Sequence, residues 1–172
     1  MNDKIKLITR TALLLALTVA FQGIKLGQFV TGPLVNAVLY ISAYAVGWPA
    51  GIFIGAVTPW IALLTGILKP ALAPAVPFIM LGNALLVVGF SLLNTFNSYV
   101  AVLCASVVKF LILYVSTRFL LQLNPAIASA LQLPQLVTAL IGGALAMIVI
   151  SALNSIDVAP KLGKVKNRIH KL

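Results

Sequence analysis

Six stretches of apolar residues run along the chain, separated by short segments rich in glycine, proline and charge. Each stretch is long enough, or nearly so, to cross a hydrocarbon layer of roughly 30 Å as a helix. The stretches cover about 7–24, 34–47, 50–67, 74–92, 98–122 and 132–156. The expected fold class is therefore an all-α membrane protein: six transmembrane helices in one compact bundle. Residues 1–172 would form a single integral membrane domain that ends in a basic tail, 157–172.

Composition supports this pattern, and the distribution of charge predicts an orientation. The 172 residues are 62% hydrophobic and 8% charged, with a net charge of +10. Of the 12 basic residues, 3 + 5 = 8 flank the first and last spans: Lys4, Lys6, Arg10, Lys161, Lys164, Lys166, Arg168 and Lys171. Basic flanks mark the cytoplasmic side. We therefore expect both termini inside, with segments 25–33, 68–73 and 123–131 facing outward, and this clustering argues against nucleic acid as the partner.

The second span is predicted to be unusually short, about 14 residues between Gly32-Pro33 and Gly47-Trp48-Pro49. A helix of that length covers about 21 Å at 1.5 Å per residue. The outward segment 25–33 before it is interpreted either as a flexible lid or wall of a cavity or as an ordinary surface loop. In the third span, Pro59 removes a hydrogen bond to the Gly55 carbonyl and is expected to kink the helix.

Small residues recur every four positions in the first span, at Ala12, Ala16 and Ala20. This spacing places them on one face of a helix. Such stripes let another helix approach closely in lipid, either within the same bundle or from a partner. The stripe begins just after the basic N-terminal flank, where a membrane-embedded partner on the cytoplasmic side can dock.

Size, span count, cytoplasmic termini and an Ala-xxx-Ala stripe in the first span together resemble the S components of energy-coupling factor (ECF) transporters. The stripe reads Ala12-Leu13-Leu14-Leu15-Ala16 here. Segments 32–36 (Gly-Pro-Leu-Val-Asn) and 77–83 (Pro-Phe-Ile-Met-Leu-Gly-Asn) are also similar to that family. The resemblance covers nearly the whole chain in architecture.

The resemblance implies a substrate-binding subunit of the prokaryotic plasma membrane that captures a vitamin or other micronutrient from outside. It also implies two kinds of partner, a membrane T component that meets the alanine stripe and a pair of ATP-binding-cassette ATPases. The chain itself would not be an enzyme. In agreement, it has no G-x-x-x-x-G-K-[ST] phosphate loop. No cofactor and no metal site are expected, because one cysteine and one histidine make no metal cluster.

Lys109 is the strongest candidate for contact with a substrate. It lies deep in the fifth span, and the only carboxylates of the sequence, Asp3 and Asp157, lie outside the spans. An ionisable side chain inside a membrane indicates a functional site. Its alternative partners are backbone carbonyls and neighbouring amides or hydroxyls. We favour a ligand, which would be small, anionic and carboxylate-bearing, such as a vitamin of the pantothenate, biotin, lipoate or niacin class.

Other polar side chains are predicted to join Lys109 from the outer halves of different spans: Asn36, Tyr40, Asn83 and Gln135. An amide in lipid is costly unless it is paired, so Asn83 should face inward, as a contact either between helices or with substrate.

Three further basic residues lie toward the outer side. Lys25 and Lys69 are expected on outward segments, where they would make the outer mouth positive and attract an anion. Arg118 is expected to face away from Lys109 and to reach the outer interface.

Two other classes of function compete with a binding subunit. A stand-alone secondary transporter or channel would need a proton or ion relay, and no carboxylate lies within the spans. An intramembrane enzyme would need a catalytic cluster, and the spans contain neither paired acids nor a Ser/His/Asp set.

Overall fold

All regular structure in the described residues is helical. The computed structural model describes residues 3–121 and 123–155. The basic tail 157–172 and the last residues of the predicted spans 98–122 and 132–156 lie outside them. The long helices are α1 (Asp3–Gly23), α2 (Gln28–Ala45), α3 (Trp48–Leu64), α4 (Val76–Leu93), α5 (Ser98–Val115) and α7 (Leu133–Ser155). Short helices are η1 (Pro70–Ala75), the π-helix η2 (Ser116–Leu120), α6 (Pro125–Ala128) and η3 (Ser129–Leu131). The expected all-helical class is thus confirmed.

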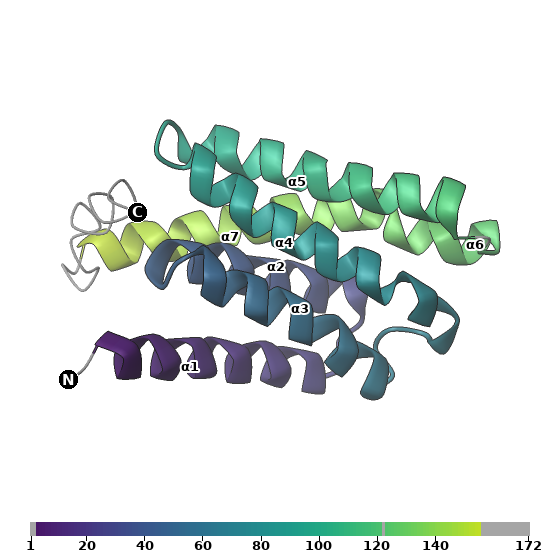
Figure 1. Ribbon diagram of the computed structural model, residues 1–172, viewed down its shortest axis with the longest axis horizontal. Coiled ribbons are helices and arrows are strands. Elements are labelled where there is room, and N and C mark those ends of the chain that lie inside the picture. The colour runs from purple at the N-terminus through teal and green to yellow at the C-terminus, as the bar shows by residue number, and fades with distance from the viewer. Residues whose placement is uncertain (1–2, 122, 156–172) are drawn as a thin grey trace.

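The six long helices run up and down along one common direction (Figure 1). The start of α1 and the end of α7 lie at one end of the bundle, together with the α2–α3 and α4–α5 connections. The α1–α2, α3–α4 and α5–α7 connections lie at the other end, which we call the cavity end. Helix α2 is central and packs against α1, α3, α4 and α7.

Several helices are long and apolar enough to cross a membrane. They span Asp3–Gly23, Pro70–Leu93, Ser98–Leu120 and Pro125–Ser155, when the short helices are joined to the long ones that they continue. Helix α3 is apolar but shorter, with 17 residues. Helix α2 has 18 residues and carries three of the polar cavity-lining side chains described below, Gln28, Thr31 and Asn36.

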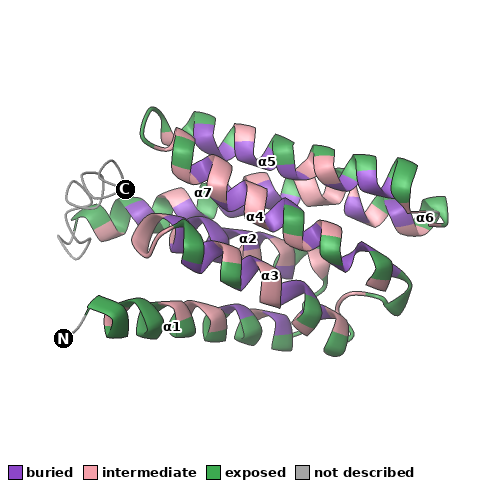
Figure 2. Cartoon of the chain, viewed as in Figure 1, coloured by how far each residue is buried: buried purple, intermediate pink, exposed green. Residues whose placement is uncertain are grey.

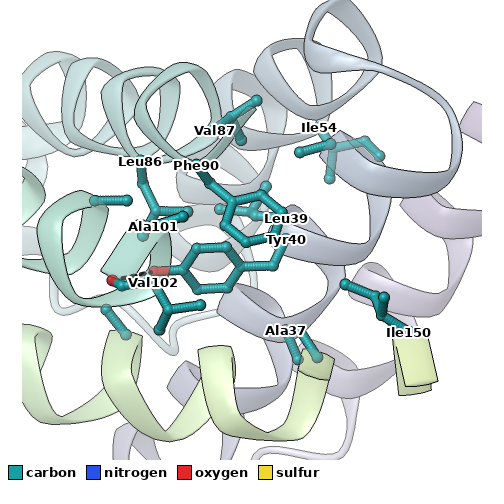
Figure 3. Close-up of a cluster of buried hydrophobic side chains, with 14 residues drawn as sticks. Ala37, Leu39, Tyr40, Ile54, Leu86, Val87, Phe90, Ala101, Val102 and Ile150 are labelled. Carbon is teal, nitrogen blue, oxygen red and sulfur yellow. Dashed lines mark hydrogen bonds between the residues drawn. The ribbon is translucent and has the colours of Figure 1, made fainter. Parts of the chain in front are cut away.

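The hydrophobic core lies between α2, α4, α5 and α7. Figure 3 shows its centre, where the ring of Tyr40 meets that of Phe90 edge-on with centroids 5.0 Å apart. By contrast, most of α1 is exposed along its length (Figure 2). Its inward face is a stripe at helical spacing that includes the buried Thr18 and Gln22.

The structure corrects the prediction for the second span. Helix α2 begins at Gln28 rather than at residue 34, so the proposed 25–33 lid shrinks to a linker of four residues, 24–27. Its 18 residues cover about 27 Å. Pro33 lies inside the helix at the cost of one backbone hydrogen bond. Packing offsets this cost, because the start of α2 is buried against α7, where Gly142 has no side chain to separate the two backbones.

Two other segments are more ordered than the sequence predicts. The proline-rich segment 69–77 contains a 3₁₀ helix, η1, which ends where α4 begins. The outward segment 123–131 forms α6 and η3, and the Asn124 side chain caps α6 by accepting a hydrogen bond from Ala126 N at 3.0 Å.

Candidate functional site

A cavity of about 100 Å³ lies among the helices at the cavity end. At about 30 Å³ for each water in the liquid, this space corresponds to about three waters. The lining residues described by the structure come from all six long helices and from the α3–α4 connection. The main polar lining residues are Gln22, Gln28, Thr31, Asn36, Thr58, Asn83, Lys109 and Gln135.

Among the described side chains that line this cavity, Lys109 is the one cation. Only 3% of it is exposed, and its ammonium donates a hydrogen bond to Asn36 Oδ1 at 2.7 Å. The stem lies against Gly82 of α4, where an added Cβ would come within 3.3 Å of Lys109 Cγ. No acidic side chain of the described residues lines the cavity. Asp3, at the far end of α1, forms its ion pair with Lys6, at 3.7 Å.

Asn36 is held in a single orientation by its neighbours. Its Oδ1 accepts from the ammonium of Lys109, and its Nδ2 donates to Thr138 Oγ1 at 3.5 Å. Close contact between α2 and α7 fixes its backbone, because a Cβ on Gly142 would lie 2.6 Å from Asn36 Cβ. The predicted pair of Lys109 and Asn36 therefore meets in the structure. Gln135, one turn before Thr138, also lines the cavity.

Asn83 owes its position to the proline in α3. Pro59 has no N–H to bond the Gly55 carbonyl. Asn83 Nδ2 donates to that carbonyl instead, at 2.9 Å, and Thr58 Oγ1 donates to it at 3.5 Å. The absence of a side chain at Gly55 makes room for this contact, since a Cβ there would lie 2.8 Å from Asn83 Cβ. The other amide atom, Asn83 Oδ1, is buried without a hydrogen-bond partner.

Of the other polar residues in the lining that the structure describes, Gln28 and Thr31 lie in the segment 25–33 that was interpreted as a lid or cavity wall, whereas Gln22 and Thr58 were missed by the sequence interpretation. Gln22 lies one turn after Thr18 on the buried face of α1, and its Nε2 donates to Thr58 O at 3.1 Å. Gln28 Nε2 donates to Ala130 O at 2.9 Å and ties the start of α2 to η3. A polar pair four residues apart in an otherwise apolar helix was the available signal for Gln22.

The structure places Tyr40 outside the cavity lining. The side chain is fully buried in the core, one turn along α2 from Asn36. Its hydroxyl lies 2.9 Å from Ser106 Oγ and 3.4 Å from Val102 O, the latter drawn as a dashed line in Figure 3. Tyr40 thus packs beneath the cavity and has no atom in its wall.

The remaining basic residues that were predicted near the outer side are exposed. Lys25 and Lys69 lie on the connections at the cavity end, before α2 and before η1. Arg118 is exposed on η2, whereas Lys109 is buried on α5, in agreement with opposite directions for these two side chains.

The alanine stripe of α1 does not pack within its own bundle. Ala12, Ala16 and Ala20 are all exposed. At the opposite end from the cavity, an apolar groove of about 380 Å³ runs between α1 and the start of α3. Ala12 forms part of its wall, with Leu15 and Phe53 among the other lining residues.

Comparison with known families gives one match. The model of a family described as "ECF transporter, substrate-specific component" matches residues 6–153. The comparisons with curated proteins and with solved structures found no match.

Proposed function

Because the chain belongs to the substrate-specific components of ECF transporters, a family of multi-pass membrane proteins, we propose that it captures a small anionic nutrient. The nutrient carries a carboxylate, enters from outside the cell and binds in the cavity at Lys109. Asn36, Asn83 and Gln135 fix the rest of the molecule, and the exposed Lys25 and Lys69 raise the local concentration of anions. Tyr40 supports this wall from below and does not touch the substrate.

One observation carries this proposal: a buried ammonium lines a cavity with an amide as its hydrogen-bond partner. Lysine has three N–H donors, and one of them is used, on Asn36 Oδ1. Burying a charge is costly unless it is paired. Since no acid of the described residues lies in the cavity, a carboxylate on the substrate would supply the missing negative charge.

The orientation in the membrane follows from the same proposal. The single integral membrane domain places both termini in the cytoplasm of a prokaryotic cell, as the basic flanks indicate. The cavity end then faces outward, because the start of α1 and the end of α7 lie at the opposite end (Figure 1). A substrate would thus meet Lys25 and Lys69 before it reaches Lys109.

The partners we propose are a membrane T component and a pair of ABC ATPases. The T component would dock on Ala12, Ala16 and Ala20, which are exposed and lie on one face of α1. The apolar groove next to Ala12 extends this surface at the cytoplasmic end. ATP hydrolysis would then belong to the partners and not to this chain.

Mass spectrometry of small molecules released from the purified protein tests the nature of the substrate. We expect a carboxylate of modest size from the unaltered protein and none from Lys109→Met. A neutral or cationic compound, retained equally by both proteins, would overturn the proposal.

Uptake in cells tests the partners. Cells that make this chain alone should not accumulate the released compound, whereas cells that also make a T component and the ATPases should. Robust uptake by the chain alone would show that it is a stand-alone transporter.

A further inference from the structure

Three buried oxygens of cavity-lining residues have no hydrogen-bond partner within residues 3–121 and 123–155: Gln22 Oε1, Thr31 Oγ1 and Asn83 Oδ1. Their side chains are 4%, 3% and 3% exposed. They come from three different helices, α1, α2 and α4, so the cavity brings them together rather than any local motif. Ser91 and Asn94 also have unpartnered oxygens, but these residues are only half-buried and lie outside the cavity lining.

In both cavity-lining amides, the atom without a partner has to be the oxygen. Gln22 Nε2 donates to Thr58 O, and Asn83 Nδ2 donates to Gly55 O. A backbone carbonyl only accepts hydrogen bonds, so turning either amide around would set oxygen against oxygen. The Gly55 carbonyl in particular lacks its usual helical donor, because Pro59 has no N–H. The free atoms of both amides are therefore acceptors.

We propose that the substrate carries N–H or O–H donors at a distance from its carboxylate, in a ureido, amide or hydroxyl group, and that Gln22 and Asn83 accept from them. This inference rests on the proposed function and adds a second requirement to the negative charge. Lys109 selects the anionic end of the substrate, and the amide oxygens select the donor end. Thr31, whose hydroxyl can donate or accept, lies in the same wall.

Two residues that bind different ends of one molecule give specificity that charge alone does not. A site built to hydrogen-bond a donor rejects an analogue that lacks it, because the buried acceptors stay unpaired. One such unpaired group lowers affinity by about 5- to 150-fold. Among carboxylate vitamins, the donor-bearing biotin and pantothenate thus satisfy the wall, and lipoate and nicotinate do not.

Two pairs of probes separate the requirement for a donor from the requirement for an anion. The dissociation constant of each probe is measured on the purified full chain in lipid nanodiscs, with empty nanodiscs as the blank. Biotin and lipoate share a pentanoate carboxylate on a sulfur-containing ring, and biotin adds two ureido N–H donors. Pantothenate and panthenol share the hydroxyls and the amide, and panthenol replaces the carboxylate with a CH₂OH group. We expect biotin to bind at least about 10-fold tighter than lipoate. We also expect pantothenate to bind at least about 10-fold tighter than panthenol.

Variants assign each preference to its residue. Gln22→Met removes one of the two proposed acceptors and should lower the biotin-to-lipoate ratio, while Lys109→Met should weaken biotin and lipoate by the same factor. Thr31→Val, of nearly the same shape, is the second variant and should lower the same ratio without a change in fold.

The outcomes separate this inference from the proposed function. Equal binding of biotin and lipoate, a ratio that persists in Gln22→Met and Thr31→Val, or no binding of biotin and pantothenate at millimolar concentration would overturn the donor requirement. Equal binding of pantothenate and panthenol would instead overturn the requirement for an anion.

Discussion

Replacing Lys109 by methionine tests the central element of the site. Methionine is close to lysine in length and flexibility but has no charge and no N–H donor. The change leaves the α5 backbone and the contact of the stem with Gly82 in place. It removes the one cation of the cavity lining and leaves Asn36 Oδ1 without its donor.

The expected effects on binding and on stability differ in size. Truncating one partner of a buried, hydrogen-bonded charge pair costs about 2–5 kcal/mol of binding free energy. Since 1.4 kcal/mol is tenfold in affinity, the dissociation constant should rise by about 30- to 5,000-fold. In the ligand-free protein, loss of a costly buried ammonium offsets the unpaired Asn36 oxygen, each on the order of 1–3 kcal/mol. We therefore expect little change in the free energy of unfolding.

Thermal unfolding with and without ligand measures both effects on one sample. The unaltered protein should gain stability in the presence of the compound identified by mass spectrometry, by an amount that grows with ligand concentration. Lys109→Met should unfold near the same temperature as the unaltered ligand-free protein and should lose the ligand-dependent gain. Lys69→Met is the matched control, since it makes the same chemical change at an exposed position of the same end.

Two results would contradict this argument. An unchanged affinity of Lys109→Met would show that the ammonium does not contact the substrate. An equal loss of affinity in Lys69→Met would show that the effect arises from the general positive potential of the outer mouth, with no specific contact.

Three other predictions concern the surroundings of the site. Gly142→Ala should lower the free energy of unfolding by about 1–3 kcal/mol, because the new Cβ would lie 2.6 Å from Asn36 Cβ. Gly23→Ala is the control, since an added Cβ there has nothing within 4 Å, and it should be neutral or slightly stabilising in the same denaturation assay. Equal effects of the two variants would refute this argument. Ala16→Trp should abolish co-purification with a T component while leaving ligand affinity unchanged, and retained assembly would exclude this face as the interface. Tyr40→Phe should cost about 0.5–1.5 kcal/mol of stability through its hydroxyl hydrogen bonds and should leave affinity within about twofold, so a larger loss of affinity would place Tyr40 in the site.

The sequence predicts the helical class and the buried lysine because both depend on strong, local signals. Long apolar stretches define helices, and an uncompensated cation stands out among them. The start of α2 could not be predicted in this way, since Gly32-Pro33 is a typical stop signal for a helix. Only the packing of α2 against Gly142 of α7 explains why the helix continues through the proline. That contact joins residues about a hundred positions apart and has no local signature.

The polar residues of the cavity lining likewise include some that the sequence predicts and some that it does not. Asn83 and Asn36 were predicted because an amide in an apolar stretch is costly and must find a partner. Tyr40 was expected in the site because it lies one turn from Asn36 on α2, but the helix continues into the core and carries Tyr40 below the cavity. Gln22 was missed because it lies at the end of α1, where a glutamine can equally well face water.

The site is assembled by the features that pack the helices. Pro59 removes a donor from α3, which leaves the Gly55 carbonyl to fix the amide of Asn83, while Gly55 itself makes room for that side chain. These contacts exist without a ligand, so most of the cost of ordering the polar groups is met when the bundle folds. Lys109 keeps free N–H groups and Asn83 keeps an unpartnered oxygen, and both residues line the cavity. Under the proposed function, a substrate that matches both groups would satisfy them, and one that matches a single group would leave the other buried and unpaired. Selectivity would then depend on helix packing, on residues that do not touch the substrate as well as on those that do.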